Sequence, residues 1–533
     1  MIALKKLPGI KILIFFSLII AMAGCKKSEP KEPEPKKPEP QEPKPNEPTT
    51  TRSDLTRDSI FLYAKEVYLW NDALPTYQIF NPRKYTNFSD PVLNFEHELY
   101  DISQIKINTS TGKPYEYSED GTAKYSYVDE ISKHNPVAVI PAKKSAVDLD
   151  GNGYDFGMRL SLEGYSDDFR VVVQAVYPGS DAKQKGIERG DWFTVINGVT
   201  YGTVYNDAIG RALNEALFES SSLTLQLNKK SGSTQNITLA RKSYTSSPVY
   251  KDSVYTFNSK KIGYMAYARF SNSTNSYAEF NRIFSRFSNA AVTDLIIDLR
   301  YNGGGYVSTA EYLINSIAPP SLNGSVMFVE HYNSMMQQKK ATILAKQPIL
   351  DGNDQVQYQN GRIVTYADVD FSTARQTTRF SKIGGLNSVN SIVFIVSENT
   401  ASAAELVINS LKPYISNIKL VGKRTYGKPV GFFPIRIDKY DVYFSMFQTK
   451  NSAGQGDYFD GFVPDKMVGD DLTRDFGDLQ EKCLKAAYAY LTTGAFPTVT
   501  SSVKTAGPKT LSEQGVKFGD REFKGMIENR SKF

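Results

Sequence analysis

The chain has 533 residues, which at roughly 100–200 residues per domain predicts about three or four folded units. It contains only three histidines and two cysteines, too few for a structural zinc cluster or for a fold held together by many disulfides. The formal net charge is +6, and Lys5, Lys6 and Lys11 carry half of it, so the rest of the chain offers no strongly basic surface for nucleic acid. With 40% apolar residues the chain can bury real cores, and we expect no metal, no cofactor and no nucleic-acid partner.

The first residues form a leader. After a basic start, residues 12–21 are apolar, a run shorter than the ~20 residues that a transmembrane helix needs, which is typical of a secretory signal. The small residues before Cys25 resemble the lipobox of bacterial lipoproteins, which implies that residues 1–24 are removed and that Cys25 is acylated. An ordinary signal peptide with an unmodified cysteine is the alternative. If Cys25 is lipidated, Cys483 has no partner for an intrachain disulfide.

A tether follows at residues 25–51. Residues 26–50 hold eight prolines, six lysines and six glutamates, so they cannot bury apolar surface and should form an extended spacer. At ~3.1 Å per residue such a spacer reaches about 75 Å. Leader and tether together predict an exported bacterial lipoprotein of the cell envelope, held by its lipid anchor at the outer membrane on the periplasmic or surface face.

Residues 52–150 predict a small, mostly helical N-terminal domain. Apolar residues recur at i, i+3 and i+4 over residues 60–68, which indicates an amphipathic helix that ends near residues 69–71. A second helical signal covers residues 91–102. We interpret the aromatic residues of this domain as core residues rather than as a ligand site.

The next region is rich in β-structure. β-Branched runs, turn residues and one helical stretch alternate here. Strands are expected at residues 170–175, 192–196, 223–227 and 236–240, and a helix at 205–218.

Residues 171–199 (VVVQAVYPGSDAKQKGIERGDWFTVINGV) resemble a PDZ domain, although Asp181 stands where proline is usual. The resemblance implies a PDZ-like peptide-binding domain over residues 151–246. A partner peptide would add as a strand to the edge of its sheet, and consecutive backbone N–H groups would hold the peptide carboxylate. The alternative is a small β-domain without a ligand. The implied carboxylate-binding loop contains Phe156, Gly157 and Met158.

From residue 247 to 495 strands and helices alternate. This order favours a parallel or mixed sheet covered by helices. Strands are expected at residues 262–267, 294–299 and 391–396, and helices at 277–287 and 402–411. The long segment 319–387 is expected to include a lid or hairpin, and the tail, residues 496–533, is polar and typical of a partly disordered segment.

Two loops at strand ends can carry chemistry. Residues 302–305 are Asn-Gly-Gly-Gly, and glycines permit positive φ and a close approach of the backbone to a substrate. In residues 400–405, Ser402 begins a helix, where free N–H groups favour a developing negative oxygen. Together the loops can form an oxyanion hole. The alternatives are a plain turn and a capping box between Ser402 and Glu405.

A serine nucleophile needs a base within hydrogen-bond reach, yet no histidine follows His331. Lysine is the remaining candidate if burial lowers its pKa. The segment 422–428 offers Lys423 and Lys428.

These motifs resemble the carboxy-terminal processing (tail-specific) serine proteases. Residues 400–405 match the family's TASASE motif and residues 425–428 its T-(F/Y)-G-K motif. Residues 262–264, 298–305 and 461–465 match its IGYI, DLRxNxGG and GVxPD segments. The resemblance implies a multidomain α+β protein whose PDZ-like domain precedes an α/β protease core of the ClpP/crotonase-like type with a mixed sheet. It implies Ser402 as the nucleophile, Lys428 as the general base, and the backbone amides of Gly304 and Ala403 as oxyanion donors.

The sequence departs from the family at two positions. Phe432 stands where a glutamine often orients the lysine, and Pro429 replaces the usual glycine. Gln448 is the candidate that orients Lys428 instead. We therefore expect a membrane-anchored serine endopeptidase that acts on proteins or peptides through their C-termini. A non-catalytic lipoprotein that keeps the fold and only binds peptides is the alternative, and an esterase is a weaker one because the GxSxG elbow is absent.

Overall fold

The computed structural model describes residues 50–119, 121–131, 147–350, 355–498, 510–511, 516 and 525–527. The chain divides into two units, Met1–Thr50 and Thr51–Phe533, and everything that follows concerns the second. The predicted leader, Cys25 and all but the end of the predicted tether lie outside the described residues. Among the described residues, no helix has the length and the apolar character that crossing a membrane requires.

Helices form most of the N-terminal region, as the periodicity predicts. They are α1 (Arg52–Val67), α2 (Tyr77–Phe80) and α3 (Pro91–Ser103). Thr51 and Asp54 form a capping box at the start of α1, and the Asp90 side chain caps α3. These caps satisfy backbone N–H groups that have no partner within the helix.

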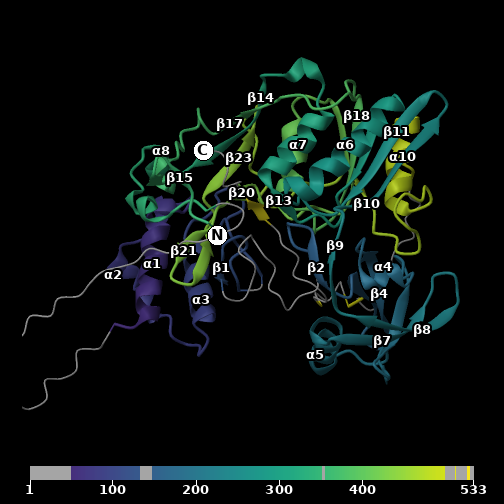
Figure 1. Cartoon of the computed structure of the whole chain (residues 1–533), viewed down its shortest axis with the longest axis horizontal. Helices are drawn as coiled ribbons and strands as arrows, with labels where there is room; N and C mark the ends of the chain where they lie inside the picture. The colour runs from purple at the N-terminus through teal and green to yellow at the C-terminus, as the bar shows by residue number, and fades with distance from the viewer. Residues whose placement is uncertain are drawn as a thin grey trace, which may run out of the picture. The chain divides into compact units, whose positions relative to one another are not determined.

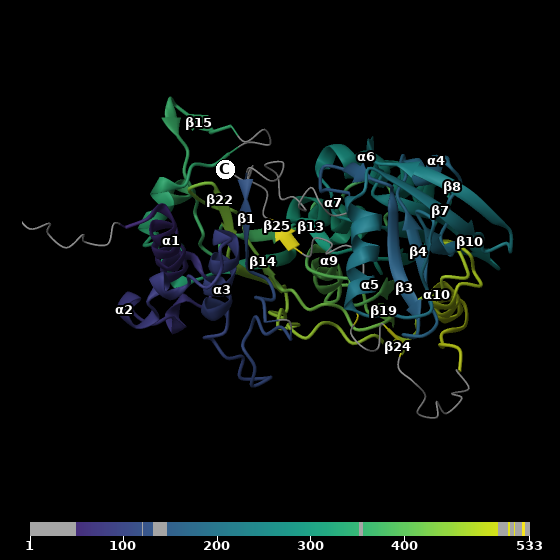
Figure 2. The same cartoon turned by 90° about the horizontal axis from the view of Figure 1, so that it is seen from below.

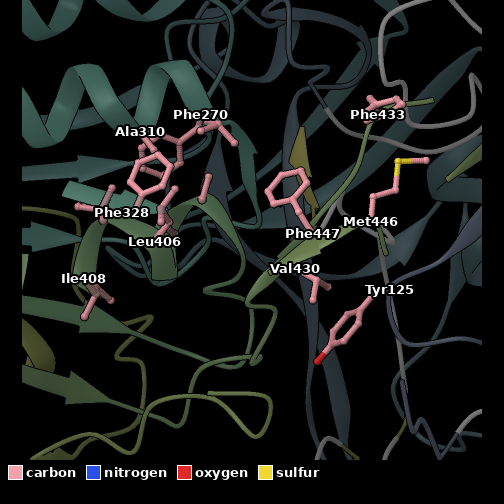
Figure 3. Close-up of a cluster of buried hydrophobic side chains, with 14 of the residues drawn as sticks. Tyr125, Phe270, Ala310, Phe328, Leu406, Ile408, Val430, Phe433, Met446 and Phe447 are labelled. Carbon is pink, nitrogen blue, oxygen red and sulfur yellow. The ribbon is translucent and has the colours of Figure 1, made fainter. Parts of the chain in front are cut away.

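The N-terminal helices share a core with later parts of the chain. β1 (Tyr127–Glu130) pairs antiparallel with β22 (Tyr440–Tyr443), which pairs in turn with β21 (Ile435–Ile437). Ile60 and Phe61 of α1 are fully buried in the same hydrophobic cluster as the later strands, and Figure 1 shows α1 and α3 in purple beside β21. Figure 3 shows part of this cluster. The apolar face of α1 is therefore covered by chain that lies hundreds of residues away.

A β-rich module, residues 152–245, has a core of its own. Its main sheet has the order β3-β4-β5-β7-β8, so β3 is an edge strand. The strands are β3 (Met158–Gly164), β4 (Phe169–Val176), β5 (Trp192–Ile196), β7 (Ser222–Asn228) and β8 (Thr234–Ala240), with the short β6 (Val199–Thr200) on β5. The helix predicted at 205–218 is α5 (Asp207–Asn214), and a π-helical turn, Glu215–Glu219, follows it.

The central sheet is mixed, as predicted. Its order is β10-β11-β12-β18-β19-β24, with β10 antiparallel to β11 and the other neighbours parallel. The strands are β10 (Val249–Phe257), β11 (Lys260–Tyr267), β12 (Asp294–Asp298), β18 (Ser391–Val396), β19 (Asn417–Gly422) and β24 (Lys466–Met467).

Helices cover both faces of this sheet (Figure 1). Along β12, Ile296 belongs to one cluster with α10 (Lys482–Thr493), whereas Leu295 and Ile297 belong to the large cluster. This alternation follows from the two-residue period of a strand. The large cluster contains α6 (Ser273–Asn289), α7 (Val307–Ile317) and α9 (Ala403–Leu411). The carboxyl ends of β12 and β18 lie side by side, and the two predicted catalytic loops begin there.

A second sheet stands beside the first. It has the order β17-β14-β23-β20, with β14 (Val326–Tyr332), β17 (Thr377–Arg379), β20 (Val430–Gly431) and β23 (Phe447–Asn451). The segment 319–387 contains a hairpin, β15 (Tyr358–Gln359) and β16 (Arg362–Ile363), as predicted, and Figure 2 labels β15 at its tip.

Parts of the tail have defined contacts. Leu511 is 1% exposed and lies in the core of the β-rich module. Residues Gly525–Ile527 form β25, which pairs in parallel with β13 (Gly304–Tyr306), and Figures 1 and 2 both show β25 in yellow beside β13. The glycine loop that the sequence suggested as a turn is thus extended from Gly304 onward, because a second strand pairs with it.

Candidate active site

Ser402 lies directly before α9 in an unusual backbone conformation. Its φ is 59° and its ψ is −114°, a strained region for a residue with a Cβ atom. The turn that leads to it is fixed on the first loop, because the Thr400 hydroxyl donates to the Leu299 carbonyl at 2.7 Å and the Ala401 N–H donates to the Asn302 carbonyl at 3.0 Å. Such strain persists only where the surroundings enforce it, and it is common at catalytic residues.

Ser402 and Glu405 have the arrangement of a capping box, but the Ser402 side chain makes no cap hydrogen bond. Its Oγ is buried and has no hydrogen-bond partner among the described residues. The Ser402 backbone N–H, in contrast, donates to Glu405 Oε2 at 2.9 Å. A buried polar atom without a partner costs free energy, and at the start of α9 this hydroxyl is placed where a negative oxygen is favoured. This geometry suits a nucleophile better than the capping alternative.

Glu405 joins the serine loop to the lysine loop. Its carboxylate is fully buried and accepts hydrogen bonds from the Thr425 hydroxyl at 2.5 Å and from the backbone N–H groups of Gly427 and Lys428 at 2.8 Å each, besides that of Ser402. Burial raises the pKa of Glu405, and the hydrogen bonds that it accepts counteract this rise. The sequence suggested Glu405 only as a cap, and the structure adds this bridging role.

Lys428 is the buried lysine of the site. It is 1% exposed, and burial lowers its pKa to about 7. Its Nζ donates to the Tyr125 carbonyl at 3.4 Å and lies 4.4 Å from the centroid of the Phe432 ring. Phe432, at the position of the family's glutamine, thus faces the ammonium with its aromatic ring. Lys423, the other lysine of the segment, is half exposed and pairs with Glu398 at 3.0 Å.

Tyr125 comes from the N-terminal region and is held on both sides. Its N–H donates to Glu116 Oε2 at 3.1 Å, and its hydroxyl donates to the Gly427 carbonyl. It therefore fixes the residue before Lys428 and offers its carbonyl to the lysine. Sequence reasoning missed Tyr125, because no local pattern connects it to a lysine 303 positions later.

Gly304 lies next to Ser402 but its amide already has an acceptor. A Cβ on Gly304 would lie 3.0 Å from the Ser402 Cβ, and its φ of +105° also favours glycine. The Gly304 N–H donates to Asn302 Oδ1 at 2.9 Å, and the Asn302 amide donates to the Tyr267 carbonyl at 3.1 Å. Ala403 is the first residue of α9, where N–H groups have no intrahelical acceptor. Of the two proposed oxyanion donors, the Gly304 N–H therefore has to give up an acceptor before it can bind an oxyanion.

Gln448 has other partners than the one that the sequence suggested. Its side-chain amide donates to the Gly456 carbonyl at 2.9 Å and to Asp457 at 3.0 Å. It holds the turn after β23. The Tyr125 carbonyl and the Phe432 ring occupy the place beside Lys428 that the sequence had assigned to Gln448.

The loop expected to bind a peptide carboxylate contains a carboxylate of its own. Gly157, at φ +89°, donates its N–H to Asp155 Oδ1 at 2.6 Å, and Asp155 also accepts from the Tyr244 hydroxyl at 2.7 Å. The side chains of Phe156 and Met158 are buried in the core of the module. The Gly157 N–H, one of the backbone donors expected to bind a peptide carboxylate, is therefore already bonded to the Asp155 side chain.

Buried ion pairs connect the β-rich module to the first loop. Arg300 pairs with Asp470 at 2.5 Å and with Glu481 at 2.9 Å, and Arg189 of the module pairs with the same Asp470 at 2.5 Å. Arg189 also donates to the Tyr301 hydroxyl at 2.7 Å. The two guanidinium groups lower the pKa of Asp470 despite its burial. A cleft of about 750 Å³, lined by residues of the module and by Arg300 and Tyr301, lies beside this network.

Comparisons with known proteins agree with these observations. Residues 261–465, which include Gly304, Ser402, Glu405 and Lys428, match peptidase family S41. The chloroplastic C-terminal processing peptidase of Tetradesmus obliquus is 22% identical over 281 residues, which cover 51% of this chain and 50% of that protein. The chain thus spans about half the length of this curated relative.

Two solved structures resemble the chain. A candidate S41 protease from Bacteroides fragilis NCTC 9343 is 21% identical with a TM-score of 0.57, over 82% of this chain and 97% of that one. The photosystem II D1 C-terminal processing protease is 16% identical with a TM-score of 0.42, over 78% of this chain and 93% of that one. The first likeness confirms the predicted mixed α/β, protease-like fold. The family resemblance predicted from the sequence is confirmed, and the chain carries a peptidase family S41 domain at residues 261–465.

Proposed function

We propose that the protein is a serine endopeptidase that forms an acyl-enzyme on Ser402, with Lys428 as the general base. The observation that carries this proposal is the Glu405 carboxylate, which holds the backbone N–H groups of both residues, at 2.9 and 2.8 Å. With its pKa lowered to about 7, a large fraction of Lys428 is uncharged near neutral pH and can accept a proton. The family match at residues 261–465 supports the same reaction class.

The proposed reaction needs Lys428 Nζ to come within hydrogen-bond reach of Ser402 Oγ, which is buried and has no hydrogen-bond partner among the described residues. Neutral Lys428 takes the proton of the Ser402 hydroxyl while Oγ attacks the carbonyl carbon of the peptide. The oxyanion faces the Ala403 N–H and the positive end of α9, and it can replace Asn302 as the acceptor of the Gly304 N–H. The Lys428 ammonium then gives its proton to the leaving amine. In the second half, water attacks the acyl carbon while neutral Lys428 takes a proton from it, and the Ser402 oxygen leaves with that proton, which releases the carboxylic acid product.

The β-rich module is proposed to bind the substrate peptide. β3 is an edge strand and can accept an extended peptide by strand addition, as a PDZ-like domain does. The name of the Tetradesmus relative, a C-terminal processing peptidase, supports protein or peptide C-termini as the substrate class. We also propose that Cys25 carries a lipid and that the tether holds the enzyme in the cell envelope, on the basis of the leader sequence alone.

A fluorophosphonate probe tests the reaction, because it labels an activated serine. We expect labelling of the full chain and its loss in both Ser402→Ala and Lys428→Ala. Lys423→Ala is the matched control, since Lys423 is half exposed and paired with Glu398, and it should be labelled like the wild type. A folded protein that resists the probe at pH 8, both as the full chain and as a chain that stops after Lys517, would contradict the proposal.

Two observations favour a second function. The Gly304 amide is already bound to Asn302, and Phe432 replaces the family's glutamine, so the site can also be read as one that binds peptides without cleaving them. A wild-type protein that is not labelled but binds an extended peptide at β3 would support that binding role.

A further inference from the structure

We propose that the segment Gly525–Ile527 occupies the substrate-binding site of its own chain and must leave before another peptide can enter. The inference rests on the proposed function, because it gives that active site an intramolecular inhibitor. Three independent observations support it: a strand pairing, a position beside the nucleophile, and a second anchor on the β-rich module.

The pairing places the segment on the oxyanion loop. β25 lies parallel to β13, with Gly525 opposite Gly304 and Met526 opposite Gly305. The Gly525 N–H donates to the Gly303 carbonyl at 3.1 Å. Strand addition to an exposed edge is how many proteases and peptide-binding modules hold an extended peptide. The segment therefore takes the backbone positions that a bound substrate would use.

The Gly525 carbonyl lies beside the nucleophile. A Cβ placed on Gly304 would be 2.4 Å from the Gly525 carbonyl oxygen and 3.0 Å from the Ser402 Cβ. Both atoms are thus within 3.0 Å of one point, and Gly525 itself is buried. No second peptide can pass Gly304 on this side while the segment is in place.

The chain just before this segment is anchored on the β-rich module. Leu511 is buried in the core of the module, and its N–H donates to the carbonyl of Gly164, the last residue of the edge strand β3, at 2.9 Å. Val516 packs against the same core and lines the cleft beside the Arg300 network. The tail thus contacts both surfaces that the proposed function assigns to the substrate.

A tethered segment inhibits more strongly than its own affinity suggests. With Val516 held, Gly525 is connected through a short linker, for which effective concentrations are on the order of millimolar. Even a segment that binds weakly would then exclude most substrate. The Gly525 N–H donates a hydrogen bond to the Gly303 carbonyl. Proline at position 525 has no N–H and would remove this hydrogen bond.

The experiment compares labelling rates. The fluorophosphonate should react at least about tenfold faster with a chain that stops after Lys517, which keeps Leu511 and Val516, than with the full chain. Gly525→Pro in the full chain should react as fast as the shortened chain. A peptide of residues 521–530 (REFKGMIENR) added to the shortened chain should restore slow labelling, and the same peptide with proline at position 525 should not. Unchanged thermal unfolding of the shortened chain shows that it is folded.

The outcomes separate the two proposals. Equal labelling of the full and shortened chains would overturn the inference and leave the proposed function intact. If neither chain is labelled, the proposed function fails. Binding of the fluorescent 521–530 peptide to the shortened Ser402→Ala chain, measured by anisotropy, then still decides the inference: saturable binding lost with proline at 525 supports it, and no binding overturns it.

Discussion

The Glu405 carboxylate accepts the backbone N–H of Lys428 at 2.8 Å, and this contact sets the position of the lysine loop relative to the serine. Each of its two oxygens accepts two hydrogen bonds. In Glu405→Gln one oxygen becomes an NH₂ group that faces two donors. An unsatisfied buried donor costs ~1–3 kcal/mol, so we expect the free energy of unfolding to fall by about 2–4 kcal/mol, as measured by denaturation. We also expect a large loss of fluorophosphonate labelling.

Glu398→Gln is the control for this prediction. Glu398 is exposed, and its ion pair with Lys423 lies at the surface, so its replacement should change stability by less than about 0.5 kcal/mol. If Glu405→Gln proves as stable and as reactive as Glu398→Gln, the bridging role of Glu405 is refuted.

Activity should rise with pH through the pKa of Lys428. The base must be neutral, and burial places its pKa at about 7, so activity should fall about tenfold per pH unit on the acid side of that value. The measurement is the rate of fluorophosphonate labelling or of peptide hydrolysis between pH 5 and pH 9. A flat profile across this range would exclude Lys428 as the base.

The same lysine should make stability depend on pH. Its pKa is about 7 in the folded chain and near 10.5 when exposed, so between these values the unfolded chain binds more protons and stability rises with pH. Below about pH 7 Lys428 is protonated in both the folded and the unfolded chain, so the burial of its charge destabilises the folded chain by the full amount. We therefore expect Lys428→Met to unfold at a higher temperature than the wild type at pH 6, with a difference that shrinks toward pH 10. A constant difference would contradict the assigned burial.

The Phe432 ring should raise the pKa of Lys428. The ring lies 4.4 Å from Lys428 Nζ and stabilises the charged form by a cation–π contact worth about 0.5–2 kcal/mol. Phe432→Leu removes the ring and should shift the acid limb of the pH profile to lower pH by about 0.4–1.5 units. Phe433→Leu, one residue on and stacked on Tyr366 instead, is the matched control and should leave the limb in place. A shift of equal size in both variants would point to a general loosening of the core.

Asp470 should couple the β-rich module to the loop of Gly304. Asp470→Asn leaves the buried Arg189 without its carboxylate partner, and breaking a buried pair costs about 3–5 kcal/mol, less here because Asp470 is 27% exposed. We expect a stability loss of about 2–3 kcal/mol and slower labelling of Ser402. Asp475→Asn removes a 3.9 Å surface ion pair with Lys230 and keeps an oxygen that can accept the Phe476 N–H, so it should change neither stability nor labelling.

The sequence predicted well what short-range patterns determine. The buried strands β12 and β18 and the amphipathic α1 follow from hydrophobic periodicity. The catalytic roles of Ser402 and Lys428, which rest on motifs near strand ends, stay predictions. The predicted helix at 205–218 corresponds to α5 and the π-helical turn that continues it to Glu219, and the change of winding at Glu215 was not predicted.

Long-range pairings could not be predicted from one sequence. Tyr125 contacts Lys428, Arg189 pairs with Asp470, and Gly525 pairs with Gly304, each across a separation of more than 200 residues. No local pattern marks such partners, because the residues are brought together only by the completed fold. Gln448 illustrates the same limit: its place on a strand near the site was correct, but its amide turns to Gly456 and Asp457.

The contact between Tyr125 and Lys428 also has a consequence for timing. The two residues are 303 positions apart, and a ribosome adds roughly 5–20 residues per second, so on the order of 15–60 s of synthesis separate them. Throughout that interval the emerging chain has no complete lysine site, and the segment of Gly525 arrives later still. The proposed Ser402–Lys428 site therefore stays incomplete until residue 428 has been synthesised.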